Sequence, residues 1–455
     1  MEKREGHVLI VPMPLQGHVS PLMKLSHRIA KHGVQVTFFT TEFLQAQLVA
    51  ALPELDGGGH RIRLVSFPDG LEPDDDRKDQ RKFSENIRKN MPVYLEDFIK
   101  KANEGNGDHK KITGVIIDAP LGWALEIPKK FGIKQAIYWC SSTGCLALVL
   151  QIPKLIEDKL IDTDGTPLKN EKIQLSPIMP AMSTNEFTWY FPSNPDLQKS
   201  MFQHIQAVST FIQSSDWVIC NWFHELDPSV HNVMPNIVSV GPLLTGEQPS
   251  GSFCSEDLSC ITWLDKQPPG SVIYVAFGST SKFSQQQIDE LARGLELANR
   301  RFLWVAWSGL RDGVTLKYPD GFLERVANLG KLVEWAPQEK VLAHPSVACF
   351  LSHCGWNSTL ESLSMGVPFL CWPYFGDQLY IQTCICESWK VGLRFDADEN
   401  GIICSHEIKQ KVEEFFCNEG IRENALKLKE MARKSVGEGG SSSKSLEYLI
   451  HQMKG

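Results

Sequence analysis

The chain has 455 residues, which is long for a single hydrophobic core and predicts two domains. Its apolar fraction of 42% and charged fraction of 22% are ordinary for a globular soluble protein. The net charge of −8 comes without a long block of lysine or arginine, which argues against DNA or RNA as a partner.

The sequence predicts a cytoplasmic protein without a membrane span. No uninterrupted apolar stretch reaches the length of about 18 residues that crosses a bilayer. The apolar run near the start is short and is broken by Pro12 and Pro14, unlike a signal peptide. The twelve cysteines include no C-x-x-C pair, so buried free thiols are expected in place of a zinc site. The protein is expected to be a monomer.

The first half alternates strand-like runs with helix-like segments, which indicates a parallel sheet with crossover helices. Leu22, Leu25 and Ile29 stand at helical spacing, and Gly33 is the predicted end of that helix. The strand-like runs cover residues 8–11, 34–40, 62–67, 114–117, 134–139, 217–221 and 237–240.

Residues 140–215 are less regular and contain prolines and aromatic side chains, including Phe187, Trp189, Tyr190 and Phe191. Such aromatics could line a pocket for a flat apolar molecule, or they could be ordinary core. For any single one of them, core packing is the more frequent situation.

Residues 245–259 are rich in Gly, Ser, Pro and acidic residues, and this composition predicts an interdomain linker. The alternation then restarts, with strand-like runs at 272–277, 302–306, 331–334, 347–351, 368–372 and 392–395. The expected organisation is an N-terminal domain at 1–244, a C-terminal domain at 260–436, and a final segment at 437–455. That segment has a flexible run at 437–443, followed by a helix at 444–453.

Two polar residues follow strands that should be neighbours. His18 comes after the first strand and Asp118 ends the fourth, and these strands lie side by side at the switch point of common doubly wound sheets. An aspartate on one imidazole nitrogen leaves the other nitrogen free to take a proton. From pattern alone, His18 could instead cap its helix or face solvent, and Asp118 could cap the segment after its strand.

Residues 335–378 supply the groups that a nucleotide-sugar needs. Trp335 offers a face on which a uracil can stack, and Ala336 and Gln338 are near enough to fix the edge of that uracil. A lone tryptophan is, however, more often part of the core. His353 and Gly355 precede a predicted helix, whose N–H groups and dipole suit a diphosphate.

That helix is predicted to begin near Asn357. Glu361 is suited to accept hydrogen bonds from two vicinal ribose hydroxyls. Ser358 and Glu361 also have the spacing of a capping box, so a purely structural role for both remains an alternative.

The polar pattern Trp335-Ala-Pro-Gln338, His353-Cys-Gly-Trp356-Asn357-Ser358, Glu361 and Asp377-Gln378 resembles the signature box of plant family-1 UDP-dependent glycosyltransferases. Residues 15–21, which include His18, resemble the N-terminal motif of the same family. The resemblance implies an α/β fold of the GT-B type, with two Rossmann-like domains facing across a cleft. It also implies that the final helix packs back on the N-terminal domain.

In the family, the histidine that matches His18 deprotonates the acceptor. The aspartate that matches Asp118 orients this histidine. The resemblance therefore implies an inverting transfer of glucose from UDP-glucose to a hydroxyl of a small apolar plant metabolite, such as a phenolic, flavonoid or terpenoid. Attack by carbon or nitrogen on the same scaffold stays open.

The resemblance also assigns the donor site. Glu361 would hold the ribose, while Asn357, Ser358 and Ser279 would reach phosphate. Asp377 and Gln378 can together read the hydroxyls of a hexose. The residue types of Gln378 and Trp356 are associated with glucose as the sugar.

The expected partners are a UDP-sugar and a small acceptor, with no metal or other cofactor. Three Asp-x-Asp pairs, at 74/76, 162/164 and 396/398, lie in polar surroundings typical of surface turns, away from the predicted nucleotide site. A nicotinamide-dependent oxidoreductase is disfavoured because no strand is followed by Gly-x-Gly-x-x-Gly. A non-catalytic nucleotide-sugar binding protein remains the other alternative.

Overall fold

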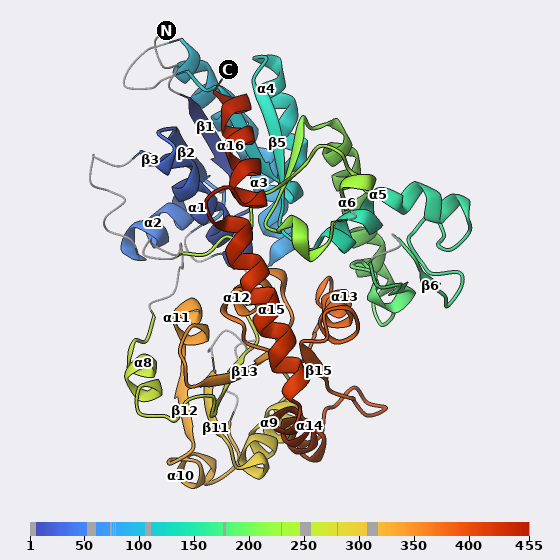
Figure 1. Cartoon of the computed structure of the whole chain (residues 1–455). Coiled ribbons are helices and arrows are strands. Elements are labelled where there is room, and N and C mark those ends of the chain that lie inside the picture. Colours follow the sequence, from blue (N-terminus) through green and yellow to red (C-terminus); the bar gives the residue numbers. More distant parts are fainter. Residues whose placement is uncertain are drawn as a thin grey trace.

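Two parallel β-sheets, each flanked by helices, form the framework of the molecule (Figure 1). The computed structural model describes residues 6–51, 61–72, 75, 77, 79–104, 111–175, 179–228, 230–245, 256–279, 281–306 and 317–454. The predicted linker therefore falls largely on residues 246–255, which lie outside the described residues.

The N-terminal sheet has seven strands in the order β3-β2-β1-β4-β5-β8-β9. The strands are β1 (His7–Val11), β2 (Gln35–Thr41), β3 (Ile62–Phe67), β4 (Gly114–Asp118), β5 (Lys134–Trp139), β8 (Trp217–Cys220) and β9 (Ile237–Ser239). All seven runs predicted from the sequence are strands. The pairing of β1 with β4, with Val11 opposite Ile117, confirms the predicted switch point.

Alternation along β1 places helices on both faces of this sheet. Val8 and Ile10 pack in one buried cluster with α1 (Gln16–Lys31), while Leu9 and Val11 pack in another cluster with α3 (Gln80–Asn103). The remaining helices of this half are α2 (Glu42–Ala51), η2 (Ala119–Leu125), α4 (Glu126–Lys130), α5 (Thr143–Glu157), η3 (Thr184–Glu186), α6 (Pro195–Ser214), η4 (His224–Leu226) and α7 (Val230–Val233).

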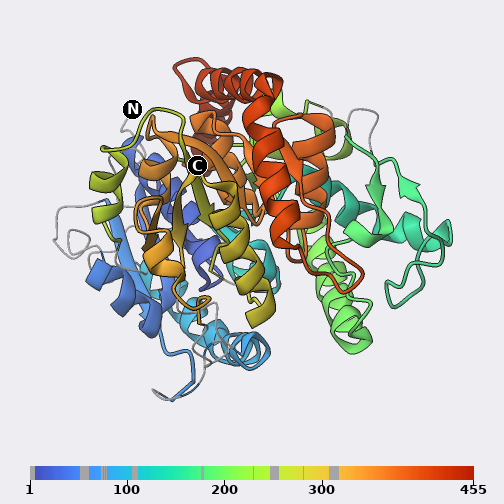
Figure 2. The same ribbon diagram turned by 90° about the horizontal axis from the view of Figure 1, so that it is seen from below.

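Residues 140–215 are more regular than the sequence indicated. They form the long helices α5 and α6 and a two-stranded hairpin of β6 (Lys172–Ile173) and β7 (Met182–Ser183), on the side of the molecule away from β2 and β3 (Figures 1 and 2). Residues 143–149 of α5 are all buried, so this part of the helix lacks the amphipathic period that reveals a surface helix. Phe187 and Trp189 are fully buried, which confirms core packing for these two aromatics.

The C-terminal sheet has six strands in the order β12-β11-β10-β13-β14-β15. The strands are β10 (Val272–Ala276), β11 (Arg301–Val305), β12 (Gly330–Val333), β13 (Val347–Ser352), β14 (Phe369–Cys371) and β15 (Gly392–Arg394). Its helices are α8 (Ser259–Leu264), α9 (Gln285–Ala298), α10 (Phe322–Arg325), α11 (Gln338–Leu342), α12 (Trp356–Met365), α13 (Gln378–Thr383), the π-turn η6 (Cys384–Ser388) and α14 (Ser405–Cys417).

Two last helices run from the C-terminal half to the N-terminal half (Figure 1). Helix α15 (Glu419–Val436) contacts α12, and α16 (Ser441–Met453) packs Leu446, Leu449 and Ile450 into the cluster around Val8 and Ile10. The flexible run predicted at 437–443 is too long, since α16 begins at Ser441. The Ser435 hydroxyl lies within hydrogen-bond distance of the hydroxyls of Ser441 and Ser442 and ties the two helices together.

Among the described residues, no helix is both long enough and apolar enough to cross a bilayer.

Candidate active site

His18 and Asp118 meet at the carboxyl ends of β1 and β4. His18 is in the first turn of α1, and its Nδ1 lies 2.7 Å from Oδ2 of Asp118, the last residue of β4. The backbone N–H of Met13 donates to the same oxygen at 3.0 Å, and the carboxylate is fully buried. Asp118 makes no capping hydrogen bond to η2, so the capping alternative is wrong and the predicted adjacency is confirmed.

The surroundings of His18 favour its protonated form. Burial alone would lower the pKa of His18, but the charge of Asp118 and the neighbouring Cys140 outweigh burial and raise it well above the ordinary value. The Cys140 sulfur lies 3.9 Å from Nε2, and burial raises the pKa of that thiol. With Nδ1 held by Asp118, Nε2 is the nitrogen that can exchange a proton with a substrate.

His353 lies between two glycine loops of the C-terminal sheet. It follows β13, and a Cβ on Gly278 or Gly355 would stand 2.7 or 2.4 Å from its Nε2, so both backbones pass close to the ring. Burial lowers the pKa of His353 to about 4, so the ring is neutral at pH 7. Its buried Nδ1 has no hydrogen-bond partner among the described residues.

The groups around His353 suit an anion. Gly355 is the N-cap residue of α12, and no side chain caps that helix end. Ser279 is half-buried and lies directly after Gly278 in the loop that follows β10. Ser279, His353 and Gly355, three of the predicted phosphate-binding residues, therefore lie on neighbouring loops.

Trp335, Ala336 and Gln338 follow β12. Trp335 is only half-buried, which disfavours the core alternative, and Ala336 is buried. Gln338 starts α11, and its Nε2 donates to the Ser358 hydroxyl at 2.9 Å and to Oε2 of Glu361 at 2.8 Å. Its side chain thus contacts the expected ribose-binding carboxylate, and its role at the edge of a uracil stays a prediction.

Ser358 and Glu361 do not form a capping box. Helix α12 begins at Trp356, so Ser358 already lies inside the first turn and cannot be the N-cap residue. The capping box is therefore wrong for this pair. The Glu361 carboxylate instead accepts from Gln338 and from a lysine of the N-terminal domain.

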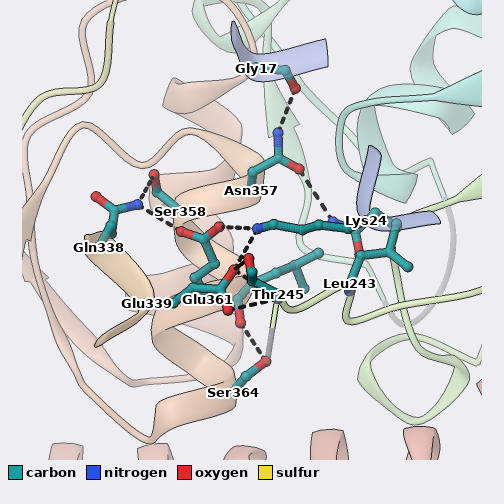
Figure 3. Close-up of polar contacts among 12 residues, drawn as sticks. Gly17, Lys24, Leu243, Thr245, Gln338, Glu339, Asn357, Ser358, Glu361 and Ser364 are labelled. Carbon is teal, nitrogen blue, oxygen red and sulfur yellow. Dashed lines mark hydrogen bonds and ion pairs between the residues drawn. The ribbon is translucent and has the colours of Figure 1, made fainter. Parts of the chain in front are cut away.

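Two residues assigned to the donor site also join the domains. The indole N–H of Trp356, which is buried, donates to the carbonyl of Asn221 at 2.8 Å. The Asn357 amide donates to the carbonyl of Gly17, next to His18, at 2.7 Å (Figure 3). The first turn of α1 is thus attached directly to the first turn of α12.

Asp377 and Gln378 lie at the start of α13. Asp377 accepts from the hydroxyl of Ser141 in the N-terminal domain, and burial raises the pKa of Asp377. The side-chain carbonyl of Gln378 accepts from the backbone N–H groups of Tyr374 and Phe375 at 2.8 and 3.2 Å. Since the loop occupies the acceptor end of this amide, its NH2 group remains the end that can read a sugar hydroxyl.

Two of the three Asp-x-Asp pairs form turns, as predicted. Asp162 accepts from the backbone of Asp164 and Thr166, and Asp398 accepts from the backbone of Asn400 and Ile402. The pair at 74/76 lies outside the described residues. Within the described part of the chain, the one group of three possible metal ligands is that of His18, Asp118 and Cys140.

Lys24 is one of the polar residues of this region that were not predicted, along with Cys140, Ser141 and Asn221. It lies on α1, is 6% exposed, and places its ammonium 2.6 Å from Glu339 and 2.8 Å from Glu361 (Figure 3). A lysine within an amphipathic helix gives no sign that its partners stand more than 300 positions away in the sequence.

Comparison with known proteins identifies the family. The family model "UDP-glucoronosyl and UDP-glucosyl transferase" matches residues 186–435. UDP-glycosyltransferase 83A1 of Arabidopsis thaliana is 42% identical over 99% of this chain and 98% of its own length. Gallate 1-beta-glucosyltransferase 84A24 of Punica granatum is 33% identical over 98% of this chain and 89% of its own length.

The fold agrees with solved structures of such enzymes. UGT2 of Phytolacca americana, solved with UDP-2fluoro-glucose and pterostilbene, matches with a TM-score of 0.80 and 26% identity, covering 99% of this chain and 100% of that one. Two Rossmann-like parallel-sheet domains of the GT-B type are thereby confirmed. The chain belongs to the plant family-1 UDP-glycosyltransferases and is an enzyme of that class.

Proposed function

We propose that this enzyme transfers glucose from UDP-glucose to a hydroxyl of a small, mostly apolar plant metabolite, with inversion at the anomeric carbon. The single observation that carries the proposal is the attachment of the His18–Asp118 pair to the predicted donor-binding residues of 335–378, called the donor box below. The amide of Asn357 in that box donates to the carbonyl of Gly17, the residue before His18. A base on α1 is therefore held beside the helix whose N-terminus suits a diphosphate.

In the proposed reaction, Nε2 of His18 takes the proton of the acceptor hydroxyl. The acceptor oxygen forms a bond to the anomeric carbon while the bond from that carbon to the UDP oxygen breaks, and UDP leaves on the opposite face. Asp118 stabilises the imidazolium that forms. A single displacement of this kind converts the α-linked sugar into a β-glucoside.

The donor end of the proposal rests on the C-terminal loops. The N-terminus of α12, the neutral His353 and Ser279 would stabilise the departing diphosphate. The acceptor class is proposed from the relatives, because one is named for gallate and another was solved with the phenolic pterostilbene. The base and the leaving-group stabilisers come from different domains, so the reaction requires both.

A matrix of donors and acceptors tests the proposal. UDP-glucose, UDP-galactose and UDP-glucuronate are each offered to a phenol, a benzoic acid, a terpenoid alcohol and an aniline, with and without EDTA. Mass spectrometry of the products and the anomeric proton coupling should show a β-glucoside made from UDP-glucose and a hydroxyl acceptor. An α-linked product, or transfer to nitrogen alone, would overturn the proposed chemistry.

Gly355→Ala should weaken donor binding. The new Cβ would lie 2.4 Å from Nε2 of His353, and this buried ring would have to move away from the helix end. Overpacking of this kind typically costs about 1–3 kcal/mol, so the KM for UDP-glucose should rise about tenfold. Gly420→Ala on α15 is the control, because the nearest atom to its Cβ is 3.5 Å away. Equal donor KM values for the two variants would contradict the role of the His353 loop.

A further inference from the structure

Lys24 is a buried cation that joins the two domains. Its ammonium contacts Oε1 of Glu339 on α11 at 2.6 Å and Oε1 of Glu361 on α12 at 2.8 Å (Figure 3). Lysines are rarely this buried unless their charge is paired. Burial alone would lower the pKa of Lys24, but the two carboxylates outweigh burial and raise it, so the ammonium is charged at any physiological pH.

The contacts of Glu361 leave some of its hydrogen-bond acceptor positions unused. Oε1 accepts from Lys24 and Oε2 accepts from Gln338 at 2.8 Å. A carboxylate offers about four acceptor positions, so two remain after these bonds, one on each oxygen. Lys24 and Gln338 together fix the plane of the carboxylate, and the remaining positions suit two adjacent hydroxyl donors.

Glu339 is also held by Thr245, at the start of the predicted linker. Its carboxylate accepts from the backbone N–H of Thr245 at 2.8 Å and from the hydroxyl of that residue at 2.7 Å. Thr245 follows the last strand of the N-terminal sheet. Lys24 therefore lies between a carboxylate fixed by the first residue of the predicted linker and a carboxylate of the donor box.

Helix α1 carries both His18 and Lys24. Six residues of helix separate them by about 9 Å along the axis, and a helix transmits such a spacing rigidly. His18 is the proposed base, and Lys24 contacts the proposed ribose-binding residue. The same helix can therefore set the position of the base relative to the nucleotide.

We propose that Lys24 is a positioning residue for the nucleotide: it holds Glu361 in the orientation that accepts the two ribose hydroxyls, and so makes nucleotide affinity depend on the docked N-terminal domain. This proposal rests on the proposed function, in which Glu361 binds the ribose. It adds that a residue outside the donor box and outside the C-terminal domain controls that carboxylate.

Lys24→Met tests the proposal in the full-length enzyme. Calorimetry should show the Kd for UDP rising about tenfold, because Glu361 loses a charge-assisted hydrogen bond that orients it. The KM for UDP-glucose should rise to a similar extent, while the acceptor KM stays within about twofold. Lys31→Met is the matched control, since Lys31 lies exposed in the last turn of the same helix, and it should leave both constants unchanged.

A nucleotide lacking one hydroxyl separates positioning from general loss of structure. Wild type should bind 2′-deoxy-UDP about tenfold more weakly than UDP, and Lys24→Met should reduce this ratio to less than about threefold. A purely structural role for Lys24 would weaken both nucleotides equally and leave the ratio unchanged. An unchanged ratio in a folded variant therefore overturns the proposal.

Two further variants keep the result interpretable. Lys24→Met leaves Glu339 and Glu361 close together without a cation, so Lys24→Met combined with Glu339→Gln removes one negative charge and should fold while showing the same reduced ratio. Glu361→Gln tests the donor site itself. If Glu361→Gln binds UDP like wild type, the proposed ribose site is wrong. If it binds weakly while the Lys24 variants do not, the role of Lys24 alone is wrong.

Discussion

Replacing His18 by alanine should reduce the turnover number about a thousandfold, within the range by which a general base accelerates such reactions. The variant removes Nε2, the one atom of the His18–Asp118 pair placed to accept the acceptor proton. The backbone of the first turn of α1 remains, so the carbonyl of Gly17 can still accept from Asn357. UDP affinity should therefore stay within about twofold of wild type.

Steady-state kinetics and calorimetry on the same preparation check this prediction. His32→Ala is the control, because His32 lies exposed just after the end of α1 and contacts neither substrate site. If His18→Ala keeps more than about a tenth of the activity, His18 is not the base. If it loses UDP binding together with activity, the role of His18 is structural.

Replacing Asp118 by asparagine should change both the rate and its pH dependence. In wild type, the reaction needs neutral His18, whose pKa is raised, so kcat/KM should increase with pH until it passes that pKa. Asparagine removes the charge that raises the pKa, and burial, which lowers it, then dominates. The acidic limb of the profile should therefore move to lower pH by about one unit or more.

The maximal rate of Asp118→Asn should nevertheless fall about a hundredfold or more, because the imidazolium formed during the reaction loses its counter-charge. The buried Oδ1 of Asp118 has no hydrogen-bond partner among the described residues, so an amide NH2 placed there would also cost about 1–3 kcal/mol of stability. A thermal unfolding measurement separates that loss from catalysis. A lower rate with an unshifted pH profile would show that Asp118 does not set the pKa of His18.

The parallel sheets were predictable because their signals are local. Buried parallel strands appear as short apolar runs, and all thirteen predicted runs are strands. The switch-point rule then placed His18 beside Asp118, although 100 positions separate them. By contrast, α5 escaped detection because its first seven residues are all buried, so no polar residue marks a helical period there.

Polar contacts were less predictable than strands. The spacing of Ser358 and Glu361 allowed a capping box, but the N-cap residue of α12 is Gly355, three positions before Ser358. Gln378 was expected to offer a sugar both a donor and an acceptor, whereas the N–H groups of Tyr374 and Phe375 occupy its carbonyl. Side-chain hydrogen bonds depend on where neighbouring loops lie, which no local pattern encodes.

The sequence by itself determined the two sheets, their strand order at the first switch point, and the residues that form the candidate donor box. Apolar periodicity and strand-end position are properties of short segments, and they survive in any arrangement of the domains. Only the tertiary structure decided in which domain the hydrogen-bond partner of each polar side chain lies. Lys24, Trp356 and Asn357 all bond across the domain boundary, because burying a charge or an N–H group requires a partner that only the docked domains bring within reach.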